Sequence, residues 1–319
     1  MRKIIIGSND AGQRLDKFLC KAVPSLPQSL LYKYLRLKRI KLNGKKAAPS
    51  IRLQQGDLLE LFINDEFFNP TRPQFDFLTA GKRLDIVYED NNLLLVDKKQ
   101  GLIVHPDQKE YRDTLIGRIQ RYLFENGEYN PKAGQSFAPA LANRIDRNTG
   151  GIVIAAKNAQ ALRVLNEKMK NREIEKYYLC LVHGIPQKRE ATLTGYLYKD
   201  ESKNQVTVQR TPIPSGKTIT TRYRVLIADG DKALLEVQLL TGRTHQIRAH
   251  LASIGHPLVG DGKYGKNAAD KKEGFVHQAL YSYKLKFAFR SDAECLNELN
   301  GQEFTVRDVW FARPYLEGI

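Results

Sequence analysis

The sequence predicts an α+β protein with a small N-terminal α/β module and a larger domain rich in strands. Helical and strand patterns alternate closely in the first part of the chain, whereas short apolar strands dominate the rest. The later helices do not alternate regularly with strands, so a parallel βαβ sheet is not expected. The 319 residues, of which 42% are hydrophobic, are enough for about two domains. We place these domains at residues 1–72 and 84–319, with a linker at 73–83.

The N-terminal module is expected to contain two helices and two strands. Apolar residues at positions 15, 18, 19 and 22 have helical spacing, and Pro24 ends this first helix. Pro27 is suited to the first position of a second helix, whose apolar face includes Leu31 and Leu35. The strands are predicted at Ile40–Leu42 and Leu58–Ile63, and Asn43-Gly44 between them favours a hairpin turn.

The elements of the larger domain follow a segment without periodicity. Residues 67–82 contain Pro70 and Pro73, which indicates a linker. Asn158 is placed to cap a helix with apolar residues at positions 162, 165 and 169. A second helix is predicted at residues 244–254, because a glycine and a proline follow it as an end signal. Strands are predicted at residues 84–88, 93–96, 152–156, 177–182, 218–225 and 233–239, with a hairpin joining the first two.

The distribution of charge points to a polyanionic partner. The formal net charge is +16, and no acidic residue occurs between Leu31 and Gly56. A solvated helix face usually mixes charges of both signs, so this one-signed run favours phosphate binding over a merely solvated surface. Nucleic acid is therefore the expected partner. The basic residues of the run are Lys33, Arg36, Lys38, Arg39, Lys41, Lys45, Lys46 and Arg52.

Other classes of protein are disfavoured by the cysteine, histidine and apolar patterns. Cys20, Cys180 and Cys295 are far apart and odd in number, so neither a disulfide framework nor a thiolate metal site is expected. The histidines at positions 245, 250 and 256 lack the usual spacing of a zinc site, and no Gly-x-Ser-x-Gly turn of a hydrolase occurs. No apolar stretch reaches membrane-spanning length and no signal peptide is recognisable, so we expect a cytoplasmic protein.

The first candidate for chemistry is the loop Asn143–Gly151. Its sequence is Asn-Arg-Ile-Asp-Arg-Asn-Thr-Gly-Gly, and it leads into a buried strand. Polar residues and glycines in this position let the backbone approach a ligand closely. Asp146 lies between Arg144 and Arg147. Taken alone, the pattern also fits a surface loop whose aspartate pairs with an arginine.

Two further segments contain polar residues in regular elements. In residues 175–182, strand alternation places Tyr178 on an apolar face, which is also where a core tyrosine would lie. In residues 241–251, His245 and Arg248 are neighbours at i, i+3 on the predicted helix. This spacing also fits an exposed polar helix face. The segments therefore indicate chemistry as a set rather than singly.

The N-terminal module resembles the S4 RNA-binding domain family. The match rests on Gln13–Leu19 (Gln-Arg-Leu-Asp-Lys-Phe-Leu), on the second helix, and on Ile40–Lys45 (Ile-Lys-Leu-Asn-Gly-Lys), and it covers residues 12–64. S4 domains bind structured RNA through their helix pair and the following turn, so the resemblance implies the same activity here. The residues expected to contact RNA are Arg14, Lys33, Arg36, Lys38, Arg39, Lys41 and Lys45.

Residues 84–315 are similar to the RluA family of pseudouridine synthases. Four motifs carry the resemblance, in the family's order and spacing. They are residues 86–90 leading to 101–106, the run Arg-Ile-Asp-x-x-Thr-x-Gly at 144–151, Lys176-x-Tyr178, and residues 241–251 followed by 255–261. The chain departs from the family pattern at three positions, because Lys99, Asn143 and Gly150 stand where Pro, His and Ser are usual.

The resemblance implies an RNA-modifying isomerase that breaks the N1–C1′ bond of a uridine, turns the uracil and rejoins it through C5. Asp146 is then the essential carboxylate, acting either as a nucleophile or by removing a sugar proton. Arg248 is expected to pair with it. Tyr178 is expected to stack on the uracil and to help remove the C5 proton. The residues expected to contact RNA are Arg144, which would fill the gap left by the flipped nucleotide, Arg243 and His245.

No cofactor or metal is implied, because the isomerisation needs no redox step and no group carrier. We expect a monomer that acts on large-subunit ribosomal RNA, as relatives with an S4 domain commonly do. The alternatives are a transfer RNA pseudouridine synthase, a non-catalytic RNA-binding ribosome-assembly factor, and a nucleic-acid glycosidase. Retention of Asp146, Tyr178 and Arg248 argues against the assembly factor, and a glycosidase would release free uracil.

Overall fold

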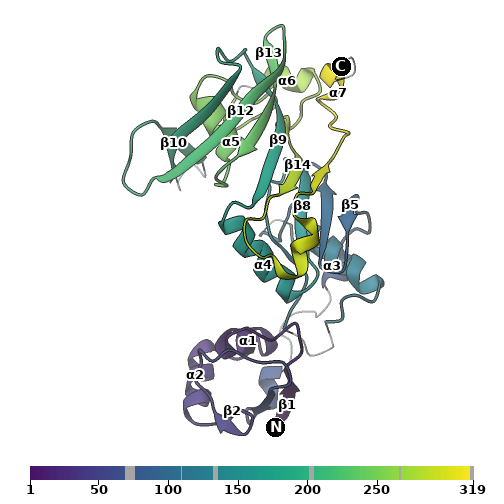
Figure 1. Cartoon of the computed structure of the whole chain (residues 1–319), viewed down its shortest axis with the longest axis vertical. Coiled ribbons are helices and arrows are strands. Elements are labelled where there is room, and N and C mark those ends of the chain that lie inside the picture. Colours follow the sequence, from purple (N-terminus) through teal and green to yellow (C-terminus); the bar gives the residue numbers. More distant parts are fainter. Residues whose placement is uncertain (69–75, 109, 132–135, 201–204, 266, 317–319) are drawn as a thin grey trace.

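The structure, a computed structural model of the chain, describes residues 1–68, 76–108, 110–131, 136–200, 205–265 and 267–316. The described residues form two parts with separate hydrophobic clusters (Figure 1). The smaller part contains the N-terminus and lies at one end of the molecule, and the larger part is built on an 11-stranded sheet. The predicted α+β class with a mainly antiparallel sheet is confirmed.

The N-terminal module is a four-stranded antiparallel sheet in the order β1–β4–β2–β3, with two helices. Leu15, Phe18 and Leu19 from the first helix, with Leu31 and Leu35 from the second, are buried in its core. The helical apolar spacing therefore predicted the buried faces correctly. The elements are β1 (Arg2–Ile5), α1 (Leu15–Ala22), α2 (Gln28–Arg36), β2 (Ile40–Leu42), β3 (Lys45–Lys46) and β4 (Leu58–Leu61).

The local turn signals of this module correspond closely to the structure. Asn43 and Gly44 have φ values of 51° and 75°, the two positive angles that a type I′ hairpin turn requires, so the predicted hairpin is confirmed. Helix α2 begins at Gln28, one residue later than predicted. Pro27 has an extended ψ of 140° and therefore serves as the N-cap instead of the first helical residue.

The large sheet follows the order β11–β10–β12–β13–β9–β14–β8–β6–β5, with β7 beside β8 and β15 beside β14. Its described strand pairs are antiparallel except for β14 and β8, which run parallel. The strands are β5 (Ile86–Glu89), β6 (Leu93–Lys98), β7 (Ala140–Leu141), β8 (Gly150–Ala156), β9 (Ile174–His183), β10 (Glu190–Asp200), β11 (Gln205–Gln209), β12 (Lys217–Asp229), β13 (Lys232–Leu239), β14 (Leu280–Phe287) and β15 (Glu303–Thr305). The helices are α3 (Leu115–Glu125), α4 (Ala159–Lys170), α5 (Gln246–Ser253), α6 (Ala268–Lys272) and α7 (Arg313–Leu316), with short 3₁₀ helices η1 (Asp65–Phe68), η2 (Asp76–Thr79) and η3 (Glu294–Leu299).

Helices cover both faces of the large sheet, because alternate residues of β8 belong to two different hydrophobic clusters. Helices α3 and α5 contribute Leu115 and Ile247 to one cluster, which also contains Tyr178. Helix α4 and η3 pack in the other cluster. Asn158 caps α4 as predicted, since its side chain accepts a hydrogen bond from the N–H of Ala161 at 2.8 Å. Strands β6 and β8 are therefore buried along their whole length.

The helix predicted at residues 244–254 begins later, at Gln246. The side-chain Oε1 of Gln246 accepts a hydrogen bond from the N–H of Arg243 at 3.1 Å and so holds a turn before the helix. His245 has a φ of 53°, in the left-handed region, and lies outside the helix. The predicted i, i+3 helical relation between His245 and Arg248 is therefore wrong, although both side chains reach the same carboxylate.

Part of the segment predicted as a linker packs against the larger domain. Residues 69–75, with Pro70 and Pro73, lie outside the described residues. Phe77 in η2 is 8% exposed, and its ring centroid lies 5.6 Å from that of Phe124 on α3. One buried aromatic residue produces no periodic pattern, so the sequence did not indicate this contact.

The two parts of the molecule meet through polar contacts. The buried carboxylate of Asp10 accepts hydrogen bonds from the N–H and the hydroxyl of Ser136, at 2.9 and 2.6 Å. Gln13 donates to the same hydroxyl at 3.0 Å. Asn9 accepts a hydrogen bond from the N–H of Ala159 at the start of α4, at 3.3 Å. None of the hydrophobic clusters of the described residues spans both parts.

Candidate active site

Asp146 lies in the loop between β7 and β8, and close packing fixes the backbone around it. Gly151 has a φ of 113°, and a Cβ there would lie 2.2 Å from the carbonyl oxygen of Ser282, so only glycine fits. The buried amine of Lys98 donates to the carbonyl oxygen of Arg147 at 2.8 Å. The loop is therefore held from behind, while the carboxylate of Asp146 remains partly exposed.

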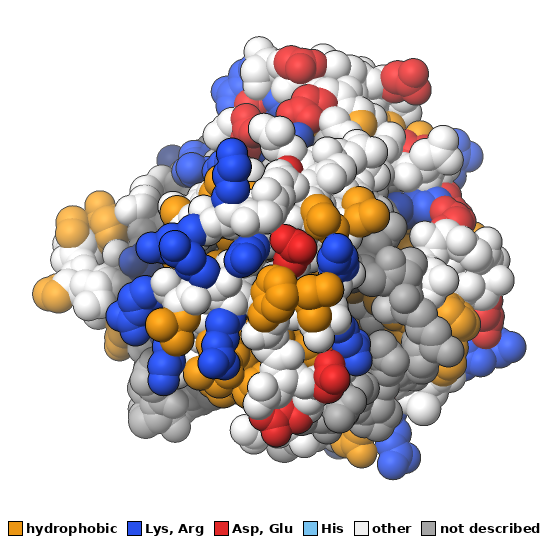
Figure 2. All heavy atoms as spheres, turned by 90° about the horizontal axis from the view of Figure 1, so that it is seen from below, with side chains coloured by type: hydrophobic (Ala, Val, Ile, Leu, Met, Phe, Trp, Pro, Cys, Tyr) orange, Lys and Arg blue, Asp and Glu red, His pale blue; other side chains and the backbone are white. Residues whose placement is uncertain are grey.

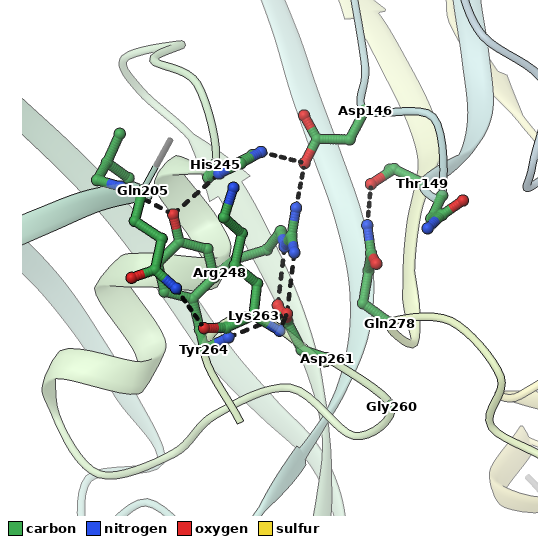
Figure 3. Close-up of polar contacts among 12 residues, drawn as sticks. Asp146, Thr149, Gln205, His245, Arg248, Gly260, Asp261, Lys263, Tyr264 and Gln278 are labelled. Carbon is green, nitrogen blue, oxygen red and sulfur yellow. Dashed lines mark hydrogen bonds and ion pairs between the residues drawn. The ribbon is translucent and has the colours of Figure 1, made fainter. Parts of the chain in front are cut away.

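Arg248 of α5 joins Asp146 to a second, buried carboxylate (Figure 3). Its Nη1 donates to Oδ2 of Asp146 at 2.8 Å. Its Nε and Nη2 donate to both oxygens of Asp261, at 2.7 and 2.9 Å. The side chain of Asp261 is 0% exposed and that of Asp146 is 28% exposed. Arg248 is thus anchored on the protein side and presents one N–H to the solvent-accessible aspartate.

The Arg248–Asp261 pair stays charged in spite of its burial. Burial alone would lower the pKa of Arg248, but the hydrogen bonds and negative charges of Asp261 and Asp146 raise it above its ordinary value. Burial would raise the pKa of Asp261, but Arg248 and the backbone N–H groups of Lys263 and Tyr264 hold it below its usual range. The guanidinium is therefore a fixed hydrogen-bond donor toward Asp146.

Asp146 opens into a cleft of about 630 Å³, which also has Tyr178 and Arg248 in its lining. This volume suits a ligand of nucleotide size. Tyr178 comes from β9 and is 5% exposed. Burial raises the pKa of its phenol to about 12, and the negative charge of Asp146 adds to this effect, so the phenol is protonated at neutral pH. The three residues predicted for chemistry therefore lie in one cleft.

The cleft also contains the three residues predicted to contact RNA in this domain. Arg144 and Arg243 are exposed at its lining. His245 is half-buried and lies deeper, with its Nε2 3.8 Å from Oδ2 of Asp146. Its Nδ1 lies 2.9 Å from the hydroxyl oxygen of Tyr264. His245 therefore faces the carboxylate, whereas the two arginines are available to an RNA backbone.

The departures from the family pattern have local partners. A Cβ on Gly150 would lie 2.3 Å from the ring of Tyr281, so the usual serine would collide with this ring. The side chain of Asn143 accepts a hydrogen bond from a backbone N–H of β8 at 2.8 Å and so fastens the loop to the sheet. Lys99 forms ion pairs with two aspartates at 2.8 and 3.1 Å. Lys99 and Gly150 are not part of the cleft lining, whereas Asn143 lines the cleft and also fastens its loop to the sheet.

The basic residues predicted in the N-terminal module lie at its surface. Exposed are Lys33, Arg36, Lys38, Arg39 and Lys45, and Lys41 is half-buried. Within the described parts of the chain, no carboxylate forms an ion pair with any of them. Figure 2, which views the end of the molecule where the module lies, shows Lys and Arg side chains gathered over one part of this face. Arg14 differs, because its guanidinium donates to both oxygens of Asp16 at 3.1 and 2.7 Å.

Asp261 and Tyr264 were not predicted as site residues. Asp261 anchors Arg248, and Tyr264 contacts His245. The available signal was the run Gly260-Asp261-Gly262, an acidic residue between two glycines shortly after the helix that contains the arginine. The contact between Tyr264 and His245 has no comparable sequence signal, because it depends on the path of the chain after α5.

The described regions were also searched for other kinds of site. They contain no helix with both the length and the apolar character needed to cross a membrane. Nor do these regions contain a group of three or more His, Cys, Asp or Glu residues that could hold a metal ion.

Comparison with known proteins identifies the family of this chain. The family model described as RNA pseudouridylate synthase matches residues 92–253. An uncharacterized RNA pseudouridine synthase of Mycoplasma genitalium is 36% identical over 297 residues, which cover 89% of this chain and 88% of the relative. Ribosomal large subunit pseudouridine synthase D of Yersinia pestis is 32% identical over 295 residues, which cover 88% of this chain and 85% of the relative.

A solved structure supports the fold. The human protein RNA pseudouridylate synthase domain containing 4 has a TM-score of 0.55 and 20% identity, and the match covers 71% of this chain and 89% of the human one. The family match includes the loop with Asp146, the strand with Tyr178 and the helix with Arg248. The chain therefore belongs to the RNA pseudouridylate synthase family and is an RNA pseudouridine synthase, an isomerase.

Proposed function

We propose that this enzyme isomerises specific uridines in large-subunit ribosomal RNA, with Asp146 as its catalytic residue. The observation that carries the assignment is the partly exposed carboxylate of Asp146, held by Arg248 at 2.8 Å in a cleft of nucleotide size. Arg248 fixes one carboxylate oxygen without leaving the buried Asp261. Asp146 can therefore approach a sugar in a defined orientation.

The cleft accounts for the steps of the isomerisation. A base can reach it only after leaving its stack. Arg144, which is exposed at the cleft lining, would then fill the vacated position. The ring of Tyr178 then stacks on the uracil. Asp146 either attacks C1′ or removes a sugar proton, and both routes need the same carboxylate. The detached uracil turns within the cleft and bonds to C1′ through C5. C5 then loses its proton and N1 gains one, so no atom is gained or lost overall.

The N-terminal module supports ribosomal RNA as the substrate. Its exposed Lys33, Arg36, Lys38, Arg39 and Lys45 have no carboxylate partner within the described residues, which suits binding to phosphates. Structured RNA is recognised largely through its shape and backbone, so a second RNA-binding surface away from the cleft favours a large folded target. The Yersinia pestis relative is named for the large ribosomal subunit.

The decisive experiment maps pseudouridine in ribosomal and transfer RNA from cells with and without the gene. The deletion should remove a small set of large-subunit pseudouridines, and wild-type protein should restore them. Asp146→Asn should not restore them, because it lacks the carboxylate. Asp229→Asn, a matched change at an exposed aspartate, is the control and should restore them fully. Loss confined to transfer RNA would contradict the substrate, and restoration by Asp146→Asn would contradict the catalytic residue.

A further inference from the structure

The contacts of Tyr264 favour one of the two neutral tautomers of His245. The hydroxyl oxygen of Tyr264 accepts a hydrogen bond from the N–H of Val206 in β11 at 3.1 Å, and it lies 2.9 Å from Nδ1 of His245. A phenol has one O–H to donate, and among the described residues Nδ1 is the acceptor placed to receive it. The neutral imidazole then carries its own proton on Nε2.

This Nε2–H points at one particular oxygen of Asp146 (Figure 3). Nε2 of His245 is 3.8 Å from Oδ2, the same oxygen that accepts the hydrogen bond from Arg248 at 2.8 Å. A separation of 3.8 Å is long for a hydrogen bond, but such contacts often tighten when substrate binds. Oδ1 of Asp146 has no hydrogen-bond partner in the described part of the chain. The two carboxylate oxygens are therefore not equivalent.

We propose that Tyr264 is a positioning residue that fixes the proton of His245 on Nε2, so that His245 and Arg248 together hold Oδ2 of Asp146 and leave Oδ1 as the reacting oxygen. The inference rests on the proposed catalytic role of Asp146 and deepens it. His245 thereby has a role in orienting the carboxylate, which is distinct from the RNA contact predicted from the sequence.

The packing around Tyr264 makes its hydroxyl separable from its ring. The rings of Tyr264 and His245 meet edge to face, with centroids 5.6 Å apart. The guanidinium of Arg248 lies over the Tyr264 ring at 5.2 Å from its centroid. Tyr264→Phe keeps both ring contacts and removes the hydroxyl, which is the O–H toward His245 and also the acceptor for the N–H of Val206. The variant therefore tests the tautomer without removing the packing.

The proposal also sets a dependence on pH. The pKa of His245 is lowered, chiefly by burial and also by the positive charges of Arg248 and Lys263. The negative charges of Asp146 and Asp261 raise this pKa but do not cancel the lowering. The imidazole is therefore neutral at neutral pH. When the pH falls through the pKa of His245, Nδ1 gains a proton and the O–H of Tyr264 must turn away. The charged imidazolium then competes with Arg248 for the carboxylate of Asp146. The hydrogen bond from Tyr264 favours the neutral ring, so Tyr264→Phe should move the acid limb of kcat to higher pH.

Substitutions of His245 separate this role from a backbone role. Glutamine places an amide N–H near the position of Nε2, whereas asparagine places one near Nδ1. The φ of 53° at this position is better tolerated by asparagine than by glutamine. If His245 served only to adopt the left-handed backbone, His245→Asn would be the more active variant. If His245 orients Asp146 through its Nε2–H, as we propose, His245→Gln is the more active variant.

The test uses the full-length enzyme, an RNA fragment containing the target uridine, and ¹⁵N-histidine NMR. Tyr264→Phe should lower kcat about tenfold with KM little changed. His245→Gln should exceed His245→Asn in kcat, and the wild-type spectrum should show the Nε2–H form. Tyr111→Phe, at an exposed tyrosine, is the control and should match wild type. An Nδ1–H form in the wild type, the reverse order of the His245 variants, or an unchanged kcat and acid limb in Tyr264→Phe would overturn the proposal. An active Asp146→Asn enzyme would instead overturn the proposed function.

Discussion

Asp261→Asn should lower the free energy of unfolding of the larger domain, because it removes one charge from a buried ion pair. The side chains of Arg248 and Asp261 are 9% and 0% exposed and share two hydrogen bonds, so the variant leaves the guanidinium without its main countercharge. Removing one partner of such a pair costs about 3–5 kcal/mol, and the remaining amide oxygen places this variant near 3 kcal/mol. In a domain of this size that loss lowers Tm by roughly 6–12 °C.

The assay is urea unfolding followed by tryptophan fluorescence. The chain has one tryptophan, Trp310, which packs against Phe275 and Phe311 in the larger domain and so reports on that domain. The pKa of Asp261 is lowered in the folded state, so its stabilisation is complete well above its unfolded pKa of about 3.9 and is lost as the pH falls through the folded value. The difference between wild type and Asp261→Asn should therefore be largest near neutral pH and shrink in acid.

A matched surface pair provides the control. Arg163 makes the same two-bond contact with Glu294, at 3.0 and 2.7 Å, but these side chains are 61% and 34% exposed. Glu294→Gln should therefore change the free energy of unfolding by about 1 kcal/mol or less. Equal losses in Asp261→Asn and Glu294→Gln would refute the reasoning, since burial would then not decide the cost of the missing charge.

Three further predictions follow from other contacts. Gly150→Ser should lower the free energy of unfolding by about 1–3 kcal/mol, because the serine side chain would overlap the ring of Tyr281. In a double-mutant cycle with Tyr281→Leu, the two losses should be less than additive. A Gly150→Ser variant as stable as wild type would contradict this prediction. Replacing Lys33 and Arg36 by alanine should reduce the slope of log K against log salt by roughly 1.4–1.8 in RNA filter binding, and an unchanged slope would exclude these phosphate contacts. Tyr178→Phe should leave RNA affinity unchanged but lower kcat by about 10²-fold, whereas an unchanged kcat would remove the hydroxyl from the reaction.

The motifs of the cleft could be predicted from the sequence because each is local. Asp146 lies in a loop before an apolar strand, and Tyr178 lies in a continuous apolar run that is typical of a buried strand. Helix α3 was missed, although Thr114 caps it and its apolar residues have helical spacing, so the signal was present. Strand β14 was also missed, and its parallel pairing with β8 could not be predicted, because it joins residues more than a hundred positions apart.

The geometry that sets the chemistry could not be predicted, because it depends on the return of the chain to the cleft. Asp261 lies thirteen positions after Arg248, beyond a helix end and two turns, and only the folded backbone brings its oxygens to the guanidinium. Tyr264 contacts His245 from the same returning segment and meets the N–H of Val206 in β11. Residue types alone indicated the charges, but not which carboxylate oxygen each donor would meet.

The polar joint between the two parts has a consequence for how substrate is captured. Asp10 and Ser136 meet through a few hydrogen bonds, and no shared hydrophobic cluster in the described residues fixes one part on the other. Two RNA-binding sites of modest affinity on one chain act as a bivalent binder, because binding at the first site sets the effective RNA concentration at the second site. With the basic module bound to a helix of the target, as we propose, the uridine would meet the cleft at a local concentration that free RNA in solution does not reach. Specificity can then arise from the distance between two RNA features, even where neither site is selective alone.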